Sequence, residues 1–114
     1  SINARPLSLV VNSASPLTGL SGGDPSIRLT AILTYSDGKT RDVTGNVTWR
    51  LLGPIGILQG NVFTPDVAES VSEFGRAFGS ITATWRNTET GAEILGATPI
   101  FEVRSKVVPL IPEG

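Results

Sequence analysis

The chain contains no cysteine, no histidine and no methionine among its 114 residues. Without cysteine it forms no disulfide bond and offers no thiolate ligand to a metal ion. Without histidine it lacks the side chain that most often acts as a general base and most often binds transition metals. The missing initiator methionine indicates an excised or processed piece of a longer protein.

Charged residues are also scarce, and their signs balance. They make up 17% of the chain, with nine basic and ten acidic side chains and a formal net charge of -1. Binding to a nucleic-acid backbone requires clustered lysine and arginine, so these scattered charges argue against a nucleic-acid partner. The longest apolar runs are too short to cross a bilayer, so we expect no membrane span in this segment.

The length and composition predict one folded domain. A hydrophobic content of 39% in a chain of this length is sufficient for a single modest core. We assign residues 5–108 to this domain. Residues 1–4 are interpreted as a remnant of cloning, and residues 109–114, which include two prolines, as a linker or tail.

The clearest local pattern is a β-hairpin. Residues 27–35 alternate between apolar and polar side chains, as a half-buried antiparallel strand does. Asp37 and Gly38 follow, and both residue types tolerate the positive φ angles of a two-residue hairpin turn. We therefore expect residues 40–43 to form the return strand.

Short alternating segments, separated by glycine and proline, continue along the whole chain. This spacing is typical of an all-β sandwich of about seven strands. Residues 13–25 are expected to form a loop, and residues 65–74 either a short helical turn or an irregular loop. The expected strands are residues 5–12, 27–35, 40–43, 46–52, 57–64 (as one strand or a pair), 75–86 and 94–108.

The apolar positions of these strands predict the core. Leu7, Leu9 and Val11 share one face of the first strand. Small residues alternate along residues 75–86, and we expect them to leave space for Trp49 from across the sandwich. The predicted core contains Leu9, Leu29, Leu33, Val47, Trp49, Ile81, Ala83, Trp85, Phe101 and Val103.

Three segments follow one another in a distinctive order. They are residues 29–44 (LTAILTYSDGKTRDVT), residues 47–49 (VTW) and residues 79–85 (GSITATW). In this order they resemble the bacterial immunoglobulin-like group 2 family, and the resemblance covers nearly the whole chain. Residues 65–74 and residues 88–108 form longer segments than is usual for that family.

The resemblance implies an immunoglobulin-like antiparallel β-sandwich without a catalytic centre. Such domains occur in bacterial surface adhesins, intimin- and invasin-like proteins, extracellular glycosidases and some phage structural proteins. The expected function is that of a non-catalytic module of a larger bacterial surface or secreted protein, serving as a spacer and in cell adhesion. The expected location is extracellular, at the cell surface or in the periplasm. The expected partners are neighbouring domains and a surface glycan or protein, and we expect the isolated domain to be monomeric.

A second interpretation is a carbohydrate- or protein-binding module that is accessory to an extracellular enzyme. Its site would lie in the end loops, at residues 65–74 and 87–91, because loops often carry recognition. The absence of histidine and cysteine disfavours an enzyme in its own right. We therefore expect no catalytic residue, no cofactor and no metal, and the ligand-binding residues stay open.

Two sets of carboxylates are candidate sites, and each has a simpler interpretation. The first set could supply oxygen ligands to Ca²⁺, but its spacing matches no EF-hand and suits turns and exposed surface. The second set could pair as the carboxylates of a glycosidase, but solvated charge is the expected role. The first set is Asp24, Asp37, Asp42 and Asp66, and the second is Glu69, Glu73, Glu89 and Glu93.

Aromatic side chains could form a platform on which a sugar ring stacks. Tyr35, Trp49 and Trp85 are in phase with apolar positions, so we expect them in the core instead. Arg76 beside Phe78, and Arg86 near the following loop, could form a small binding patch, although a solvated face is the simpler expectation. The phenylalanines whose orientation the pattern leaves open are Phe63, Phe74 and Phe78.

Overall fold

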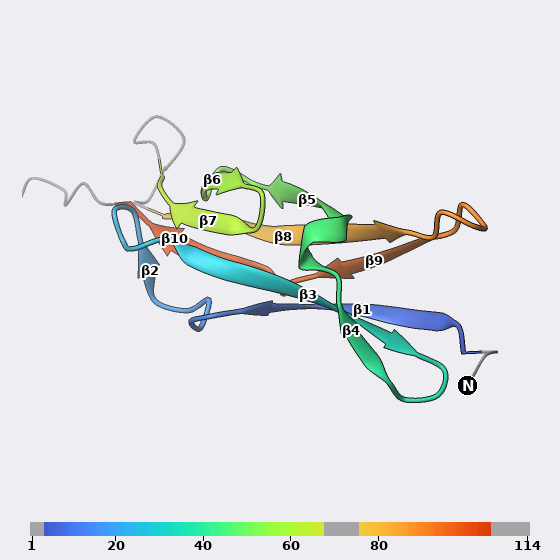
Figure 1. Cartoon of the computed structure of the whole chain (residues 1–114). Coiled ribbons are helices and arrows are strands. Elements are labelled where there is room, and N and C mark those ends of the chain that lie inside the picture. The colour runs from blue at the N-terminus through green and yellow to red at the C-terminus, as the bar shows by residue number, and fades with distance from the viewer. Residues whose placement is uncertain (1–3, 68–75, 106–114) are drawn as a thin grey trace, which may run out of the picture.

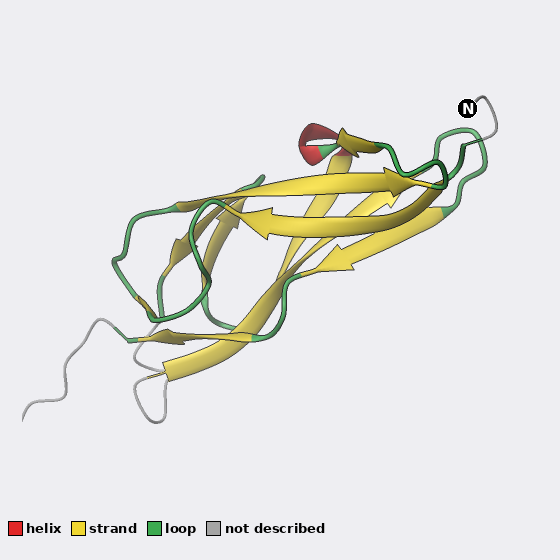
Figure 2. Cartoon of the chain, turned by 90° about the horizontal axis from the view of Figure 1, so that it is seen from below, coloured by secondary structure: helices red, strands yellow, loops and turns green. Residues whose placement is uncertain are grey.

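The computed structural model describes residues 4–67 and 76–105, and these form two β-sheets that face each other (Figures 1 and 2). The predicted remnant at residues 1–4 lies almost wholly outside the described residues, and the predicted linker at residues 109–114 does so entirely. Within the described residues no helix is long and apolar enough to cross a membrane. The elements are β1 Pro6–Ser13, β2 Leu20–Ser21, β3 Ile27–Tyr35, β4 Thr40–Asp42, the 3-10 turn η1 Thr44–Asn46, β5 Val47–Leu52, β6 Gly56–Gln59, β7 Val62–Pro65, β8 Arg76–Arg86, β9 Glu93–Ala97 and β10 Phe101–Arg104.

The order of the strands defines the class of the fold. One sheet has the order β1-β3-β7-β6, with β4 also pairing with β3, and the other has the order β2-β10-β8-β5, with β9 also pairing with β8. In immunoglobulin lettering the first sheet is A-B-E-D, and β5, β8 and β9–β10 take the places of C, F and G. The predicted immunoglobulin-like β-sandwich is confirmed, although the described residues hold ten strands instead of about seven.

The last predicted strand, residues 94–108, is wrong as one unit. The structure has two strands there, β9 and β10, and residues 106–108 lie outside the described residues. The interruption begins at Thr98, whose amide donates to the Ile81 carbonyl (2.9 Å) and whose hydroxyl accepts from the Ile81 amide (3.0 Å). Pro99 follows, and because proline has no N–H it cannot continue a ladder of backbone hydrogen bonds.

The loop predicted at residues 13–25 contains the short strand β2, which the prediction missed. Leu20 pairs in parallel with Val103 of β10 and is buried. A strand of two residues has no periodicity, so the sequence pattern could not indicate it. In the segment predicted as residues 65–74, Pro65 ends β7 and the remainder beyond Val67 lies outside the described residues.

For the hairpins, the structure contradicts one prediction and decides between two alternatives in another. The turn between β3 and β4 is a three-residue loop, because the Gly38 amide donates to the Tyr35 carbonyl (2.9 Å) and Tyr35 donates to the Lys39 carbonyl (2.8 Å). Within this loop only Gly38 has positive φ, at 85°. The prediction of a two-residue turn with positive φ at both Asp37 and Gly38 is therefore wrong. Residues 57–64 adopt the paired alternative, as β6 and β7 in antiparallel register.

Leu7 was expected to point inward with Leu9 and Val11, and this is wrong. The register of β1 against β3 shifts between Pro6 and Ser8, which leaves Leu7 as an extra residue in a bulge. The bulge breaks the alternation of faces. Leu7 is consequently 59% exposed, whereas Leu9 is buried.

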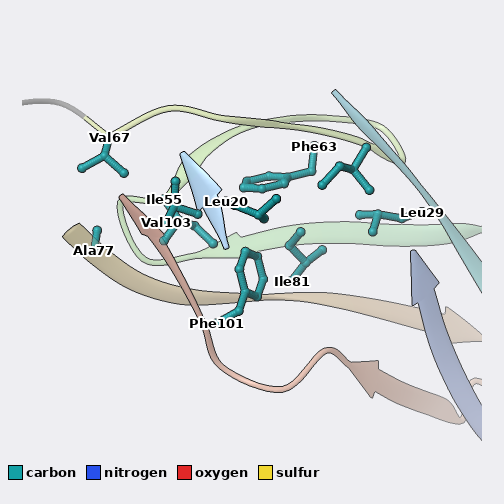
Figure 3. Packing of buried hydrophobic residues seen from close by; sticks show 10 residues of the cluster. Leu20, Leu29, Ile55, Phe63, Val67, Ala77, Ile81, Phe101 and Val103 are labelled. Atoms are coloured by element: carbon teal, nitrogen blue, oxygen red, sulfur yellow. The ribbon is translucent and has the colours of Figure 1, made fainter. Parts of the chain in front are cut away.

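Among the described residues the core consists of two clusters between the sheets. In the larger one the rings of Phe63 and Phe101 meet edge to face, with centroids 5.6 Å apart and an angle of 84° (Figure 3). The smaller one lies nearer the β3–β4 hairpin and includes Val43. The clusters are Leu20, Ile27, Leu29, Ile55, Phe63, Val67, Ala77, Ile81, Phe101 and Val103, and Leu9, Ala31, Leu33, Val43 and Ala83.

Seven of the ten predicted core residues are buried, and Val47, Trp49 and Trp85 are the exceptions. All three are half-buried because they lie on the edge strand β5 or near the end of β8. The burial of Ile55 and Phe63 was not predicted, since Ile55 lies between strands and the phase of Phe63 was ambiguous.

The small residues of β8 were expected to leave space for Trp49 from across the sandwich, and this is wrong. Trp49 belongs to the same sheet, directly opposite Ala83 on the neighbouring strand. The close approach occurs at Gly79 instead, where an added Cβ would lie within 3 Å of the Leu52 carbonyl oxygen and of the Ile55 side chain. Gly79 therefore allows Ile55 to enter the core.

Candidate functional site

The four candidate calcium-binding aspartates do not form one site. Asp24 accepts a hydrogen bond from the Ser21 amide (2.9 Å) at the end of β2, and Asp37 accepts one from the Lys39 amide (3.0 Å) in the β3–β4 hairpin. Asp66 is exposed after β7. Among the described residues no three acidic side chains are grouped so that they could hold a metal ion. The hydrogen bonds of these aspartates instead stabilise turns.

Asp42, the fourth aspartate, begins a hydrogen-bond network. Its Oδ1 accepts from both the hydroxyl and the amide of Thr44, which lowers the pKa of the exposed Asp42 carboxyl. The same hydroxyl oxygen accepts from the Ala31 amide (3.0 Å), and the Thr44 carbonyl accepts from the Trp49 indole (3.1 Å). Val43, which lies between Asp42 and Thr44 in the chain, is buried, and its amide donates to the Ala31 carbonyl. This part of the Asp-Val-Thr and Val-Thr-Trp motifs therefore has a structural role.

The candidate glycosidase carboxylates are only partly described. Glu69 and Glu73 lie outside the described residues, while Glu89 and Glu93 are exposed in and after the β8–β9 loop. This loop bonds mainly to itself, because the Asn87 Oδ1 accepts from the amides of Glu89 (2.9 Å) and Thr90 (3.3 Å). The Asn87 side-chain oxygen and the Thr90 hydroxyl, which accepts from the Ala92 amide (3.2 Å), are thus engaged within the loop.

The aromatic residues separate into core and surface. Trp49, Trp85 and Tyr35 were expected in the core; they are half-buried and pack against the smaller core cluster, so this prediction is confirmed only in part. Phe63 is fully buried, and Phe74 lies outside the described residues. The remaining candidate, Phe78, is 53% exposed on the outer face of β8.

The structure does bring Arg76 and Phe78 together, as the sequence had suggested. The Arg76 guanidinium lies 5.6 Å from the centroid of the Phe78 ring. Arg76 also pairs with Glu102 (3.4 Å), which in turn pairs with Arg104 (3.1 Å). Arg86 is at the other end of β8 and does not join this group. The patch consists of an exposed ring beside paired charges, and exposed ion pairs contribute little to stability.

A shallow hollow of about 400 Å³ lies on the outer face formed by β5, β8 and β9. Of its residues, the sequence had singled out only Glu93, as a candidate carboxylate, although alternation in the strands places the others on the outward face as well. The hollow offers hydroxyl groups, one guanidinium and one carboxylate, without a paired nucleophile and base. Its lining residues are Thr48, Arg50, Leu52, Thr82, Thr84, Glu93 and Leu95.

No protein-family model matches the chain, and no curated protein matches it. The class of the fold therefore stands on the order and pairing of the strands.

Proposed function

We propose that this chain is a non-catalytic immunoglobulin-like module that spaces and positions neighbouring domains in a larger bacterial surface or secreted protein. The observation that supports this proposal most strongly is the placement of its two ends. The described chain begins at one end of an elongated sandwich and leaves at the other (Figures 1 and 2). Domains joined through such ends are added in line, so each one lengthens the array.

The strand register identifies the two ends. Pro6, at the start of β1, pairs with Tyr35 beside the β3–β4 hairpin. Arg104, at the end of β10, pairs with Arg76 at the start of β8, whereas β8 ends at Arg86 next to the β8–β9 loop. The hairpin and this loop are at the tips of different sheets, and both lie at the entry end, opposite the exit (Figure 1).

The sandwich is also braced between these ends. The Thr44 network ties β3 in one sheet to the start of β5 in the other. Two core clusters then fill the space between the sheets along their length. A spacer needs this rigidity, because a flexible unit would not hold its neighbours apart. The extracellular or periplasmic location and the part in cell adhesion rest on the sequence resemblance alone.

The proposal is tested with two copies of the chain joined in tandem. Small-angle X-ray scattering should give a maximum dimension close to twice that of the single unit. A pair folded back on itself, with little increase in the maximum dimension, would overturn the proposal. A matched pair joined through a longer glycine–serine linker serves as the flexible reference.

The alternative function is a carbohydrate- or protein-binding module. The observation that favours this alternative is the exposed ring of Phe78 with Arg76 beside it. In the β8–β9 loop, by contrast, the Asn87 side-chain oxygen is already bonded to amides of the loop itself. Binding to a panel of glycans and matrix proteins, with and without Ca²⁺, tests it. Saturable binding that is lost in Phe78→Ser but retained in Leu7→Ser, another exposed apolar position, would favour the alternative.

A further inference from the structure

We propose that the domain is built to carry tension along its long axis, because the strands through which the chain enters and leaves are loaded in shear. This inference rests on the proposed in-line function. Hydrogen bonds in an antiparallel ladder run perpendicular to the strands. A strand pulled lengthwise therefore loads all bonds of its ladder together, whereas a strand pulled sideways at one end breaks them one after another.

The entry strand β1 meets this condition. The chain enters at Arg5 and runs along β3 toward the exit end, with pairs from Pro6 through to Ser13. Tension on the entry side pulls β1 outward along its own axis. Ser36 adds two bonds at the entry, because its amide donates to the Arg5 carbonyl (2.8 Å) and its hydroxyl accepts from the Arg5 amide (3.0 Å). The bonded length of the first strand therefore extends to Arg5, where the chain enters.

The entry strand is also seated against the second sheet. Leu9 of β1 is buried in the smaller core cluster. Its carbonyl oxygen lies so close to Gly96 of β9 that a Cβ added at Gly96 would come within 2.5 Å of it. Sliding β1 along its axis would thus disturb packing against β9 as well as the ladder with β3.

The exit strand β10 is held on both sides. It pairs in antiparallel register with β8 from Phe101 to Arg104, and in parallel with Leu20 and Ser21 of β2. The Gly22 amide adds a hydrogen bond to the Arg104 carbonyl (2.8 Å). Tension on the exit side pulls β10 along its own axis, so both ladders resist together.

Single-molecule pulling in two directions tests the inference on the folded protein. Because the chain has no cysteine, handles can be attached at chosen thiols. In one direction the protein is pulled from its two termini. In the other, Lys39→Cys and Thr88→Cys place both handles at exposed tips of the entry end, so that force opens the sandwich sideways. We expect a clearly higher unfolding force between the termini, and an equal or lower force there would overturn the inference.

A pair of proline variants identifies the ladder that bears the load. The Ala14 amide donates to the Arg28 carbonyl (2.8 Å), so Ala14 and Arg28 form a hydrogen-bonded pair. Hydrogen-bonded and non-hydrogen-bonded pairs alternate along an antiparallel ladder, so Val10, four residues earlier, also forms a hydrogen-bonded pair, with Ile32. Val10→Pro removes that donor from an outward position that is 46% exposed. We expect it to lower the unfolding force measured between the termini.

The matched control is Ile57→Pro in β6, which lies off the path of tension. The Asp66 amide donates to the Ile55 carbonyl (3.0 Å), and by the same alternation Ile57 forms a hydrogen-bonded pair with Thr64. Ile57 is 52% exposed, which matches Val10. Equal losses of force in Val10→Pro and Ile57→Pro would contradict the assignment of load to β1. If Val10→Pro fails to fold, the comparison of the two pulling directions still tests whether the domain resists tension along its long axis. Tandem copies that are in line but weak under terminal tension would overturn this inference and leave the spacer function standing.

Discussion

The indole nitrogen of Trp49 donates a hydrogen bond to the backbone carbonyl of Thr44, across 3.1 Å. Thr44 belongs to the turn η1, and its hydroxyl is bonded to Ala31 of β3 and to Asp42. Trp49 packs against both core clusters. One half-buried tryptophan therefore joins the connection between two sheets to the core, and its polar atom matters as well as its ring.

Replacing Trp49 with phenylalanine tests the polar part of this relationship. The variant keeps an aromatic ring but leaves the Thr44 carbonyl without its donor, which should lower the free energy of unfolding by about 1 kcal/mol. Trp49→Ala should cost about 2 kcal/mol, less than the ~3–5 kcal/mol of a fully buried tryptophan. Urea unfolding measures both values.

Trp85→Phe is the matched control for that prediction. Trp85 is also half-buried and lies on the neighbouring strand, but none of the described residues accepts a hydrogen bond from its indole. A loss in Trp85→Phe equal to that in Trp49→Phe would show that ring area, and not the bond to Thr44, accounts for the effect.

The two phenylalanines whose orientations the sequence left open should respond very differently to truncation. Phe63→Ala removes a fully buried ring that contacts Phe101 edge to face, and it should cost ~3–5 kcal/mol. Phe78→Ala truncates a ring that is 53% exposed, so the change should stay within about 0.5 kcal/mol. Thermal and urea unfolding compare the variants, and similar losses in both would be inconsistent with the described packing.

Gly79 and Gly45 provide a second matched pair. In Gly79→Ala the new Cβ would overlap the Leu52 carbonyl and the Ile55 side chain, so we expect a loss of about 3 kcal/mol. Gly45 has open space around its Cβ position and no positive φ, so Gly45→Ala should leave stability unchanged or raise it slightly. Equal melting temperatures for the two variants would contradict the close approach at Gly79.

Acid should weaken the Asp42 network. The Thr44 hydroxyl and amide lower the pKa of Asp42 below its ordinary value of 3.8. Because the folded pKa is the lower one, the charged carboxylate stabilises the fold above the unfolded pKa. That stability is lost as the pH falls through the folded pKa. Urea unfolding between about pH 2 and pH 7 should therefore show a loss on the acid side.

Asp42→Asn removes this titration and should make the acid side of the profile shallower. Asp37 also has a lowered pKa, because the Lys39 amide donates to it, so part of the acid loss should remain. Glu89→Gln, in an exposed loop, controls for the change in net charge. A profile of Asp42→Asn that follows the wild type at every pH would refute the role assigned to this carboxylate.

The features that were predicted from sequence are those that repeat locally. Residues 27–35 alternate cleanly, and β3 occupies the predicted range. The prediction failed where a single residue interrupts the repeat. Leu7 is displaced by a bulge that pairing with β3 reveals, and Pro99 divides the last strand. The two residues of β2 carry no repeat at all and depend on Arg104 and Val103, far along the chain.

The candidate site shows the same limit. An i, i+2 spacing in a strand places Arg76 and Phe78 on one face, and this neighbourhood was foreseen. Whether that face looks outward depends on which strands and loops cover it. Glu102, which pairs with Arg76, comes from β10 and is separated from it by 26 residues.

By itself, the sequence determined that the chain is an all-β sandwich with apolar and polar faces on its strands, because side chains alternate with a period of two along any strand. Only the tertiary structure decided which faces are covered: it buried Phe63 and left Phe78 and Leu7 exposed. It also placed Trp49 in the same sheet as Ala83, instead of in the facing sheet. It also set the entry and exit of the chain at opposite ends. Such outcomes depend on pairing between strands that are distant in sequence, and local periodicity contains no information about them.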